Sequence, residues 1–327
     1  WENGKKTIMK LTRTLIKGIL FLYCILKFRS FKMAYALAFQ NAGLKQIQGL
    51  KREGQWVVFQ ETGNKIAIAQ LPQFEFSINH LIELLQNSKV TVLNVAQDSF
   101  IVQIAGLKFN VASLSNMAVL YEVFKEEIYG VHLLKQDLLV LDIGMNVGVA
   151  SHFFANNPQV KAVHGFEPFP QTFQEATTNL ALNPQLQDKL FMHPYGVSNV
   201  SETREITLFD SGLLSASTMA SDNSVYGKQV GKTVEVYLRS IVSILDELLP
   251  QYPNSSVLLK IDCEGEEYAI FDSLKDTNYL NRVDGILVEW HEKGYAEIAT
   301  QLKEAGFQFL HLPHATANCG MIYGFKS

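Results

Sequence analysis

Apolar and polar positions change their spacing twice along the chain, and these changes divide it into three parts. Residues 1–54 combine an apolar run with many basic residues, and short strand-like runs with turn residues between them fill residues 55–112. From residue 113 to residue 327, apolar strand patterns alternate with helical ones. We therefore predict a basic, partly apolar helical segment (1–54), a small α+β appendage (55–112) and an α/β domain (113–327).

The pattern of the appendage predicts short strands around one helix. Residues 56–71 have the pattern of a β-hairpin with its turn at 62–64, and residues 77–86 that of a helix capped by Ser77. Three further strand patterns follow, at residues 90–95, 99–104 and 107–111. These elements are typical of a small unit with its own sheet.

In the α/β domain, strands and helices alternate up to the C-terminus. After a helix at 116–130, five strand patterns follow, at residues 138–144, 160–168, 189–197, 256–263 and 285–291. Helical patterns lie between them or after them, at 170–182, 241–249, 266–274 and 295–306. The last two strands, 307–312 and 320–326, have only a short link and must pair antiparallel. This order predicts a Rossmann-like α/β fold of the class I methyltransferase type, a seven-stranded, mostly parallel sheet with a C-terminal antiparallel hairpin.

The most informative motif is VLDIGMNVG at residues 140–148. A buried strand ends in Asp142, Gly144 follows, and Gly148 opens the next helix. Glycine is needed where the backbone turns sharply and approaches a ligand. The following helix N-terminus attracts an anion, here the carboxylate of a methionyl group, and Asp142 suits its ammonium. We therefore expect these residues to bind a cofactor with a methionyl end.

The next predicted strand ends in GFEP, which places Glu167 and Pro168 beside that loop. An acidic residue at this position accepts the ribose hydroxyls of an adenosine. NAD is the competing cofactor, but its fingerprint requires glycine where this chain has Asn146 and Val149, and a bulkier residue blocks the pyrophosphate. The motifs therefore predict S-adenosyl-L-methionine, with Asn146 in the binding loop.

Three more segments are expected around this cofactor. By their position in the fold, Gly196 and Val197 should flank the adenine ring. Tyr129 precedes the first strand, and two interpretations stay open: it closes over the methionyl end, or it packs in the core. The polar stretch at 211–231 is long for a loop in a compact domain and is expected to cover the site.

Candidates for chemistry lie in LLKIDCEGEEYAIF, residues 258–271. Lys260, Asp262 and Glu264 alternate at the end of a buried strand, so we expect them to share a face at the edge where ligands bind. An alcohol needs a general base to react at neutral pH. We predict Asp262 or Glu264 near the reacting hydroxyl, and His291, which ends the fifth strand, as a base or a substrate contact.

The remaining titratable residues have plainer interpretations. Glu266 and Glu267 suit the dipole of the helix that they begin, and the isolated His164 and His193 are expected to be structural. The sequence has no HxxxH and no cluster of cysteine and histidine, so no metal site is predicted. Three cysteines without metal or CxxC spacing indicate a reduced, cytoplasmic chain.

Together these segments resemble the FkbM family of methyltransferases. The resemblance covers about residues 113–327 and is carried by VLDIGMNVG, GFEP, the lead-in YEVFKEEIYG and LKIDCEGEE, which is similar to the family's K-[IV]-D-x-E-G-x-E signature. It implies S-adenosylmethionine-dependent methylation of a hydroxyl on a sugar, a lipid-linked molecule or a polyketide-like one. Arg239 and Ser240 stand where the family often has acidic residues.

A different class of function is a non-catalytic module that binds S-adenosylmethionine or a nucleotide and scaffolds a membrane-associated pathway. Asp262 and Glu264 favour catalysis, because a scaffold has no use for them. A scaffold would bind the cofactor but release no S-adenosylhomocysteine with any hydroxylated acceptor, and this distinguishes it from the enzyme.

Charge is distributed unevenly along the chain. Residues 1–54 contain 11 Lys and Arg against 2 Asp and Glu, whereas the remainder contains 17 against 30. The basic residues flank an apolar run at 18–26 and form no nucleic-acid-reading motif, so no nucleic acid partner is expected. That run is shorter than the ~20 residues that span a bilayer. Residues 10–32 are either an interfacial helix on anionic lipid or a helix packed on the protein, and a cleaved signal is a weaker third interpretation.

Overall fold

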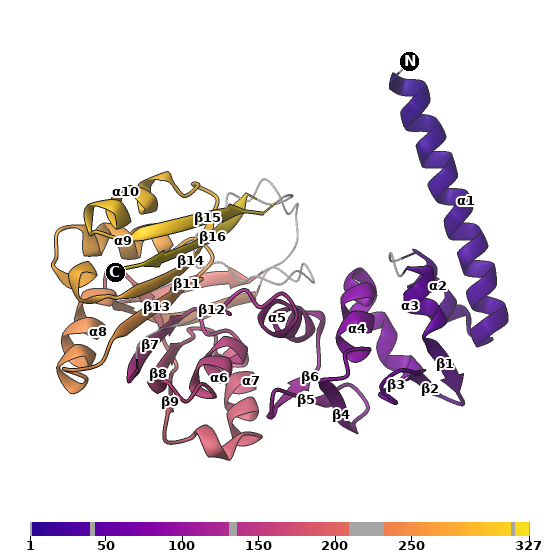
Figure 1. Ribbon diagram of the computed structural model, residues 1–327, viewed down its shortest axis with the longest axis horizontal. Coiled ribbons are helices and arrows are strands. Elements are labelled where there is room, and N and C mark those ends of the chain that lie inside the picture. Colours follow the sequence, from indigo (N-terminus) through magenta and orange to yellow (C-terminus); the bar gives the residue numbers. More distant parts are fainter. Residues whose placement is uncertain (1, 40–42, 131–135, 209–231, 315–317, 327) are drawn as a thin grey trace. The chain divides into compact units, whose positions relative to one another are not determined.

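The computed structural model describes residues 2–39, 43–130, 136–208, 232–314 and 318–326. The chain forms two compact units, Trp1–Ile128 and Tyr129–Ser327, and each is described by itself (Figure 1). The helix at Leu114–Phe124, which the sequence analysis assigned to the α/β domain, belongs to the first unit. The division of the chain at residues 54 and 112 stays a prediction.

The first unit consists of N-terminal helices followed by two small antiparallel sheets. Its helices are α1 (Glu2–Phe28), α2 (Phe31–Phe39), α3 (Leu44–Gln48), the 3-10 segment η1 (Ile68–Ser77), α4 (Ile78–Leu85) and α5 (Leu114–Phe124). One sheet consists of β1 (Leu50–Glu53), β2 (Trp56–Phe59) and β3 (Lys65–Ala67), and the other of β4 (Val90–Val95), β5 (Phe100–Ile104) and β6 (Leu107–Val111). The predicted hairpin is present as β2 and β3, but its second strand ends at Ala67, and the residues up to Ser77 form η1 instead. The predicted helix and three further strands are confirmed as α4, β4, β5 and β6.

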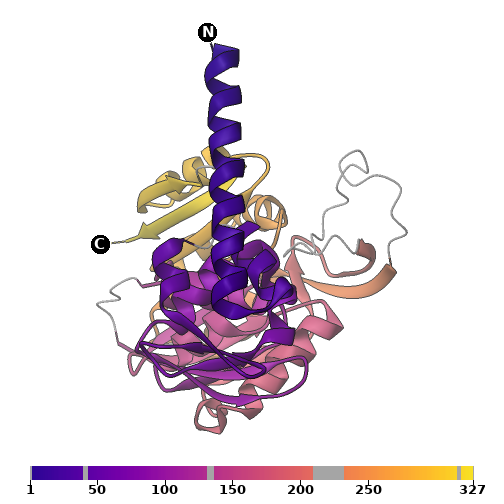
Figure 2. The same cartoon turned by 90° about the vertical axis from the view of Figure 1, so that its right-hand side faces the viewer.

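Helix α1 has one buried and one exposed side, and it extends well beyond the small sheets of its unit (Figure 2). Cys24 and Phe28 are buried. An apolar stripe on the other side has side chains that are 57–79% exposed, namely Leu15, Ile16, Ile19, Leu22 and Leu26. Leu15, Ile19, Leu22 and Leu26 follow one another at three to four residues, which puts them on one face of the helix, and Ile16 lies at its margin. Among the described residues, no helix is long and apolar enough to cross a membrane.

The second unit contains a seven-stranded sheet in the order β15-β16-β14-β13-β7-β8-β9. β16 pairs antiparallel with both β14 and β15, and the other strand pairs of this sheet are parallel. The strands are β7 (Leu138–Ile143), β8 (Val160–Phe166), β9 (Leu190–His193), β13 (Val257–Ile261), β14 (Gly285–His291), β15 (Gln308–Pro313) and β16 (Cys319–Phe325). This is the predicted methyltransferase sheet with its terminal antiparallel hairpin.

Helices lie on both sides of this sheet (Figure 1). They are α6 (Val149–Ala155), α7 (Pro170–Ala181), α8 (Ile241–Leu248), α9 (Glu267–Lys275) and α10 (Ala296–Glu304), with 3-10 segments η2 (Pro184–Leu186), η3 (Leu249–Gln251) and η4 (Tyr279–Arg282). One hydrophobic cluster joins α8, α9 and α10 to alternate residues of the central strands, such as Leu141, Leu259 and Val288. Because side chains alternate along a strand, Asp142, Lys260 and His291 face the other side. The sheet therefore has one apolar face and, at its carboxyl edge, one charged face.

The predicted third strand at 189–197 is interrupted, which corrects the placement of Gly196 and Val197. β9 ends at His193, and β10 (Gly196–Ser198) pairs with β12 (Lys232–Ser240) in another sheet. Pro194 lies between them, and proline has no N–H with which to continue the ladder. β11 (Glu202–Leu208) completes this sheet by pairing antiparallel with β12. The predicted covering loop at 211–231 lies outside the described residues.

The loop after β7 passes very close to the end of β13. Gly144 has a φ of 78°, a region that side chains disfavour, and a Cβ there would lie 1.7 Å from the carbonyl oxygen of Asp262. The amide of Asp262 in turn donates to the carbonyl of Ile143 at 3.0 Å. Only glycine allows this crossing, which brings the two loops of the sheet edge together.

We predict that Gly144→Ala destabilises the protein much more than Gly294→Ala. Both residues have a φ of 78°, but nothing lies within 4 Å of a Cβ at Gly294. Gly294→Ala should therefore show only the left-handed backbone strain, about 1–2 kcal/mol, and Gly144→Ala at least ~2 kcal/mol more. Urea unfolding followed by circular dichroism measures both losses, and equal losses would contradict the close approach.

Candidate active site

The candidate site lies where β7, β8, β13 and β14 end at the carboxyl edge of the sheet. Parallel strands bring the loops that follow them to one edge, which is where open α/β sheets bind ligands. The loops after these four strands carry the predicted glycine motif, Glu167, the acidic motif and His291. Strand order, rather than sequence separation, thus brings most of the predicted residues together.

The loop after β7 is held in an unusual conformation. Gly144, Asn146 and Gly148 all have positive φ angles, of 78°, 53° and 83°. The side chain of Asn146 accepts a hydrogen bond from the amide of Val147 at 2.7 Å, which stabilises the turn without glycine. The amide of Asn146 itself donates to Glu167 at 3.0 Å. The loop is therefore fixed to the end of the neighbouring strand.

Asp142 and Lys260 form a buried ion pair beneath this loop. Lys260 Nζ lies 2.9 Å from Asp142 Oδ1 and donates to the carbonyl of Gly144 at 2.7 Å. Ser151 donates to the second oxygen of Asp142 at 2.6 Å. Burial alone would lower the pKa of Lys260, but the carboxylates of Asp142 and Asp262 raise it. Asp142 has no exposed surface, so its contacts make it a support of the loop, and its predicted role toward a methionyl ammonium stays a prediction.

Glu167 is buried at the end of β8 with both carboxylate oxygens turned to backbone donors. Oε2 accepts from Asn146, and Oε1 accepts from the amide of Phe169 at 2.9 Å. Burial raises the pKa of Glu167 to about 7, although these two N–H donors favour the charged form. A carboxylate has about four acceptor positions. Two acceptor positions remain for the hydroxyls of a ribose, so the carboxylate of Glu167 fits the predicted cofactor.

The acidic motif forms a tight turn rather than the continued strand that the sequence predicts. β13 ends at Ile261, and Glu264 has a φ of 55° followed by Gly265 at 113°. Lys260 and Asp262 do share a face, with 3.6 Å between Nζ and Oδ2. Glu264 is turned by its backbone and lies 3.7 Å from His291 Nε2. The turn thus brings Glu264 to the fifth strand.

Glu267 organises this turn, a role that sequence reasoning missed. Its carboxylate has no exposed surface and accepts from the amides of Cys263 at 2.9 Å and Gly265 at 2.8 Å. It also lies 3.1 Å from His291 Nδ1. The helix-dipole interpretation is therefore too weak for this residue. A glutamate two residues after Gly265 is the signal that was present in the sequence.

Glu266 also has a specific role that the helix dipole does not describe. It is buried, accepts a hydrogen bond from Ser198 at 2.5 Å and pairs with Arg204. Both partners come from the β10-β12-β11 sheet. Glu266, the residue directly before α9, therefore links the β10-β12-β11 sheet to the acidic turn.

The electrostatics of the site centre on His291 and Glu264. Burial would lower the pKa of His291, but the carboxylates of Glu267, Glu264 and Asp262 outweigh it and raise the pKa to about 9. Burial raises the pKa of Glu264 to about 7 against the opposite effect of His291. At neutral pH the histidine therefore carries a proton, and the glutamate can accept one.

Gly196, Pro168 and Tyr129 line the surroundings of this edge. A Cβ at Gly196 would lie 3.1 Å from Pro168 and 2.6 Å from Leu238, so the two predicted cofactor residues pack against each other. Val197 is buried in the main cluster. Tyr129 is buried, and Lys260 Nζ lies 5.7 Å from the centre of its ring. Tyr129 thus packs in the interior, as one of the two interpretations expects. Contact of Tyr129, Pro168, Gly196 and Val197 with the cofactor stays a prediction.

His164 and His193 form a polar chain of their own. His164 Nδ1 lies 3.0 Å from His193 Nε2, and its Nε2 lies 3.1 Å from the hydroxyl of Tyr252. Burial lowers the pKa of His164 to about 4 and also lowers that of His193. The chain continues through Tyr195, which Arg239 contacts at 3.0 Å. These contacts agree with the expected structural role of both histidines.

Two groups of described side chains have spacings that suit a metal ion. Asp262, Glu264 and His291 form one, and Glu289, His314 and Cys319 form the other, with ligand atoms within 4.8 Å of one another in each. Spacing in the sequence does not reveal the second group, because Glu289 lies far from His314 and Cys319 along the chain. Strand pairing brings together residues that sequence spacing keeps apart.

Curated relatives with a similar sequence are methyltransferases. Methyltransferase sdnD of Sordaria araneosa is 26% identical in an alignment of 223 residues, and the match covers 61% of this chain and 85% of the relative. Methyltransferase 1 of Beauveria bassiana (strain ARSEF 2860) is 26% identical in an alignment of 200 residues, and the match covers 57% of this chain and 78% of the relative.

The solved structures that the chain resembles are only distantly similar to it in sequence and in fold. Methyltransferase FkbM from Methylobacillus flagellatus KT is 12% identical with a TM-score of 0.42, and the match covers 65% of this chain and only 54% of that one. M. capricolum TrmK in complex with S-adenosyl-homocysteine is 10% identical with a TM-score of 0.35, covering 62% of this chain and 67% of that one. Because both scores are below 0.5, the fold assignment depends on the strand order described above.

A family model decides the assignment. The model described as methyltransferase FkbM domain matches residues 142–309, just over half of the chain. The match begins at Asp142 and includes Glu167, the acidic turn and His291. The chain belongs to the FkbM family of methyltransferases.

Proposed function

We propose that this methyltransferase transfers a methyl group from S-adenosyl-L-methionine to a hydroxyl oxygen of a small acceptor such as a sugar, a glycolipid or a polyketide-like molecule. The family match supports the cofactor. The observation that carries the oxygen specificity is the group of Asp262, Glu264 and His291, whose ligand atoms lie within 4.8 Å of one another at the ligand-binding edge. An alcohol is a poor nucleophile at neutral pH, and these residues supply the base that it needs.

Four residues are proposed to hold the cofactor. Gly144 and Gly148 give the loop its close backbone approach, and the buried carboxylate of Glu167 is placed for ribose hydroxyls. Asn146 occupies the position at which a dinucleotide fold needs glycine, which disfavours NAD. When bound, the cofactor supplies an activated methyl group on a sulfonium. The tasks left to the protein are alignment, exclusion of water and removal of one proton.

Glu264 is the proposed general base. Its side chain is partly exposed, unlike that of Asp142, and its pKa of about 7 suits a group that accepts a proton near neutral pH. Asp262 is already paired with Lys260, whose Nζ lies 3.6 Å from Asp262 Oδ2. We propose that Asp262 instead holds the acceptor hydroxyl in line.

His291 is the proposed acceptor contact. Glu267 fixes its ring through Nδ1, and Nε2 points to Glu264 at 3.7 Å. A ring held in this way donates a hydrogen bond from Nε2 to an oxygen that lies between it and the base. His291 therefore orients the acceptor, and Glu267 is a positioning residue.

A small acceptor fits the charge of the chain better than nucleic acid. Two similar solved structures are described as a tRNA methyltransferase from Streptococcus pneumoniae and an rRNA methylase from Streptococcus thermophilus. In this chain the part after residue 54 has 17 basic against 30 acidic residues, and its described site is rich in carboxylates. Such a surface repels a phosphate backbone. A catalytically inactive scaffold is the alternative function, and turnover of any acceptor excludes it.

Titration calorimetry with S-adenosyl-L-homocysteine tests the cofactor part of the proposal. We expect saturable binding, which Glu167→Gln weakens by about 10- to 100-fold because a hydrogen-bonding charge is removed. Glu304→Gln, which changes an exposed glutamate on α10, is the matched control and should bind as the wild type does. Binding of NADH in preference, or no binding of S-adenosyl-L-homocysteine, would contradict the proposal.

Release of S-adenosyl-L-homocysteine in the presence of a panel of sugars, glycolipids and hydroxylated polyketides tests the chemistry. With any acceptor found, Glu264→Gln should lower kcat by about 10²–10⁴-fold while leaving the affinity for S-adenosyl-L-homocysteine unchanged. The base must be deprotonated, so wild-type kcat/KM should rise as pH increases through about 7, and the variant should lack this rise. Glu292→Gln is the control. A fully active Glu264→Gln beside an inactive Asp262→Asn would assign the base to Asp262 instead.

We also propose that α1 and α2 lie on the surface of an anionic membrane. Exposed apolar side chains continue from the stripe of α1 to Phe31 and Tyr35 of α2. The first 54 residues carry 11 basic and 2 acidic side chains, a charge that is complementary to anionic lipid. An amphipathic helix with a basic polar face binds at such an interface. This location would suit a lipid-linked acceptor.

Co-sedimentation with vesicles tests this contact. We expect the protein to bind vesicles of phosphatidylglycerol and phosphatidylcholine but not vesicles of phosphatidylcholine alone. Leu22→Asp with Leu26→Asp should abolish binding, because charges enter the apolar stripe. Leu93→Asp, at an exposed leucine of β4, should not. Equal binding by both variants, or a dimer that forms through α1 without vesicle binding, would refute the proposal.

A further inference from the structure

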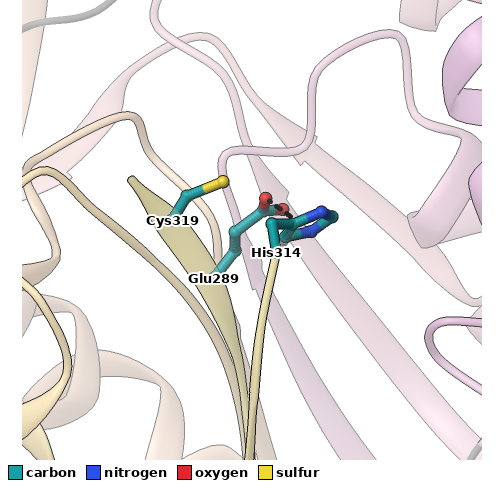
Figure 3. A group of neighbouring side chains, drawn as sticks. All are labelled: Glu289, His314 and Cys319. Carbon is teal, nitrogen blue, oxygen red and sulfur yellow. Dashed lines mark ion pairs between the residues drawn. The ribbon is translucent and has the colours of Figure 1, made fainter. Parts of the chain in front are cut away.

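Three side chains with different metal-binding atoms meet at the end of the sheet beside the candidate site. Glu289 comes from β14, Cys319 begins β16, and His314 follows β15. Figure 3 shows the thiol of Cys319 directed at the carboxylate of Glu289, with the imidazole of His314 on the other side of that carboxylate. The mechanism proposed above uses none of them.

Strand pairing fixes this arrangement. Cys319 lies opposite His291 in the antiparallel pair of β14 and β16, and Glu289 is two residues before His291. Opposed residues share a face, as do residues two apart, so Cys319 and Glu289 point to the same side. The amide of His314 donates to the carbonyl of Cys319 at 3.0 Å, which extends the pairing of β15 and β16 by one residue. The three positions are therefore set by backbone hydrogen bonds and not by chance contact of long side chains.

The spacing of the donor atoms is close to that of a metal site. His314 Nε2 lies 3.7 Å from Glu289 Oε1, and all three ligand atoms lie within 4.8 Å of one another. Ligands of a tetrahedral zinc ion, bound at about 2.0–2.3 Å, lie about 3.3–3.8 Å apart. Small side-chain rotations close the difference. The side chain of His314 is 52% exposed, which leaves it free to rotate and leaves access from solvent.

The donor types select the metal. A thiolate and an imidazole are soft or intermediate ligands that suit zinc, whereas calcium and magnesium prefer oxygen. Three protein ligands with a fourth open position are typical of zinc sites that bind water or substrate. The other group, Asp262, Glu264 and His291, contains no sulfur ligand, and the Nδ1 of its histidine already contacts Glu267. The group with Cys319 is therefore the better zinc site.

We propose that Glu289, His314 and Cys319 bind one zinc ion. The ion ties the last two strands of the sheet to β14. Glu289 Oε1 lies 3.9 Å from His291 Nε2, so the site adjoins the group that we assign to the acceptor. Metal binding at these residues does not depend on the identity of the cofactor or the acceptor.

Absorption spectroscopy of the full-length protein with Co²⁺, after removal of metals by chelation, tests this proposal. Cobalt takes the place of zinc and shows a sulfur-to-metal charge-transfer band only when a cysteine thiolate binds it. We expect one Co²⁺ per chain with this band, which Zn²⁺ displaces. Cys319→Ser should lose the band, and His314→Gln and Glu289→Gln should weaken binding.

Two variants serve as controls. Cys263→Ser removes a partly buried cysteine of the same unit that lies beside Asp262 and Glu264, and it should keep the band. His80→Gln changes a histidine that stacks on Tyr121 in the first unit, and it should bind Co²⁺ as the wild type does. Because His314 is half exposed, its variant is expected to fold, which a melting curve without metal checks.

Three results would overturn the proposal. They are the absence of Co²⁺ binding, binding without the charge-transfer band, and a band that survives in Cys319→Ser. The second would place the metal among the carboxylates of the acidic turn, and the third would assign the thiolate to another cysteine.

Discussion

A lysine buried between two carboxylates holds the functional edge of the sheet together. Lys260 lies near the end of β13, pairs with Asp142 on β7 and donates to the carbonyl of Gly144, so one ammonium group joins two strands and the glycine loop. Removing one partner of such a buried pair costs about 3–5 kcal/mol, because the other charge is left without compensation. Gly144 makes the arrangement possible, since any side chain there would collide with the carbonyl of Asp262. The loop that we assign to the cofactor therefore packs directly against the turn that we assign to catalysis.

Much of this edge could be predicted from the sequence, because local patterns determine it. Apolar runs of strand length and the glycines at 144 and 148 report a conformation that the nearby residues require. Glu167 follows from its position at the end of the next strand. These predictions need only the knowledge that parallel strands end at one edge.

Contacts that depend on the pairing of distant strands could not be predicted in this way. Glu267 has the appearance of a helix-start residue, yet it orders the acidic turn and holds His291, 24 residues later. Gly196 leaves the third strand because Pro194 interrupts the ladder. Cys319 and Glu289 meet only through the register of β14 and β16, which no spacing in the sequence reveals. Sequence patterns thus identify the strands, and the register between strands decides which side chains work together.

A crystal structure of the protein with S-adenosyl-L-homocysteine is the most direct test of the central claim, that this edge is the methyl-transfer site. The account predicts the ribose hydroxyls within hydrogen-bonding distance of Glu167, the backbone of residues 144–148 against the ligand, and the sulfur on the side of Glu264 and His291. A ligand bound elsewhere, or bound here with its sulfur turned away from the acidic turn, would contradict it.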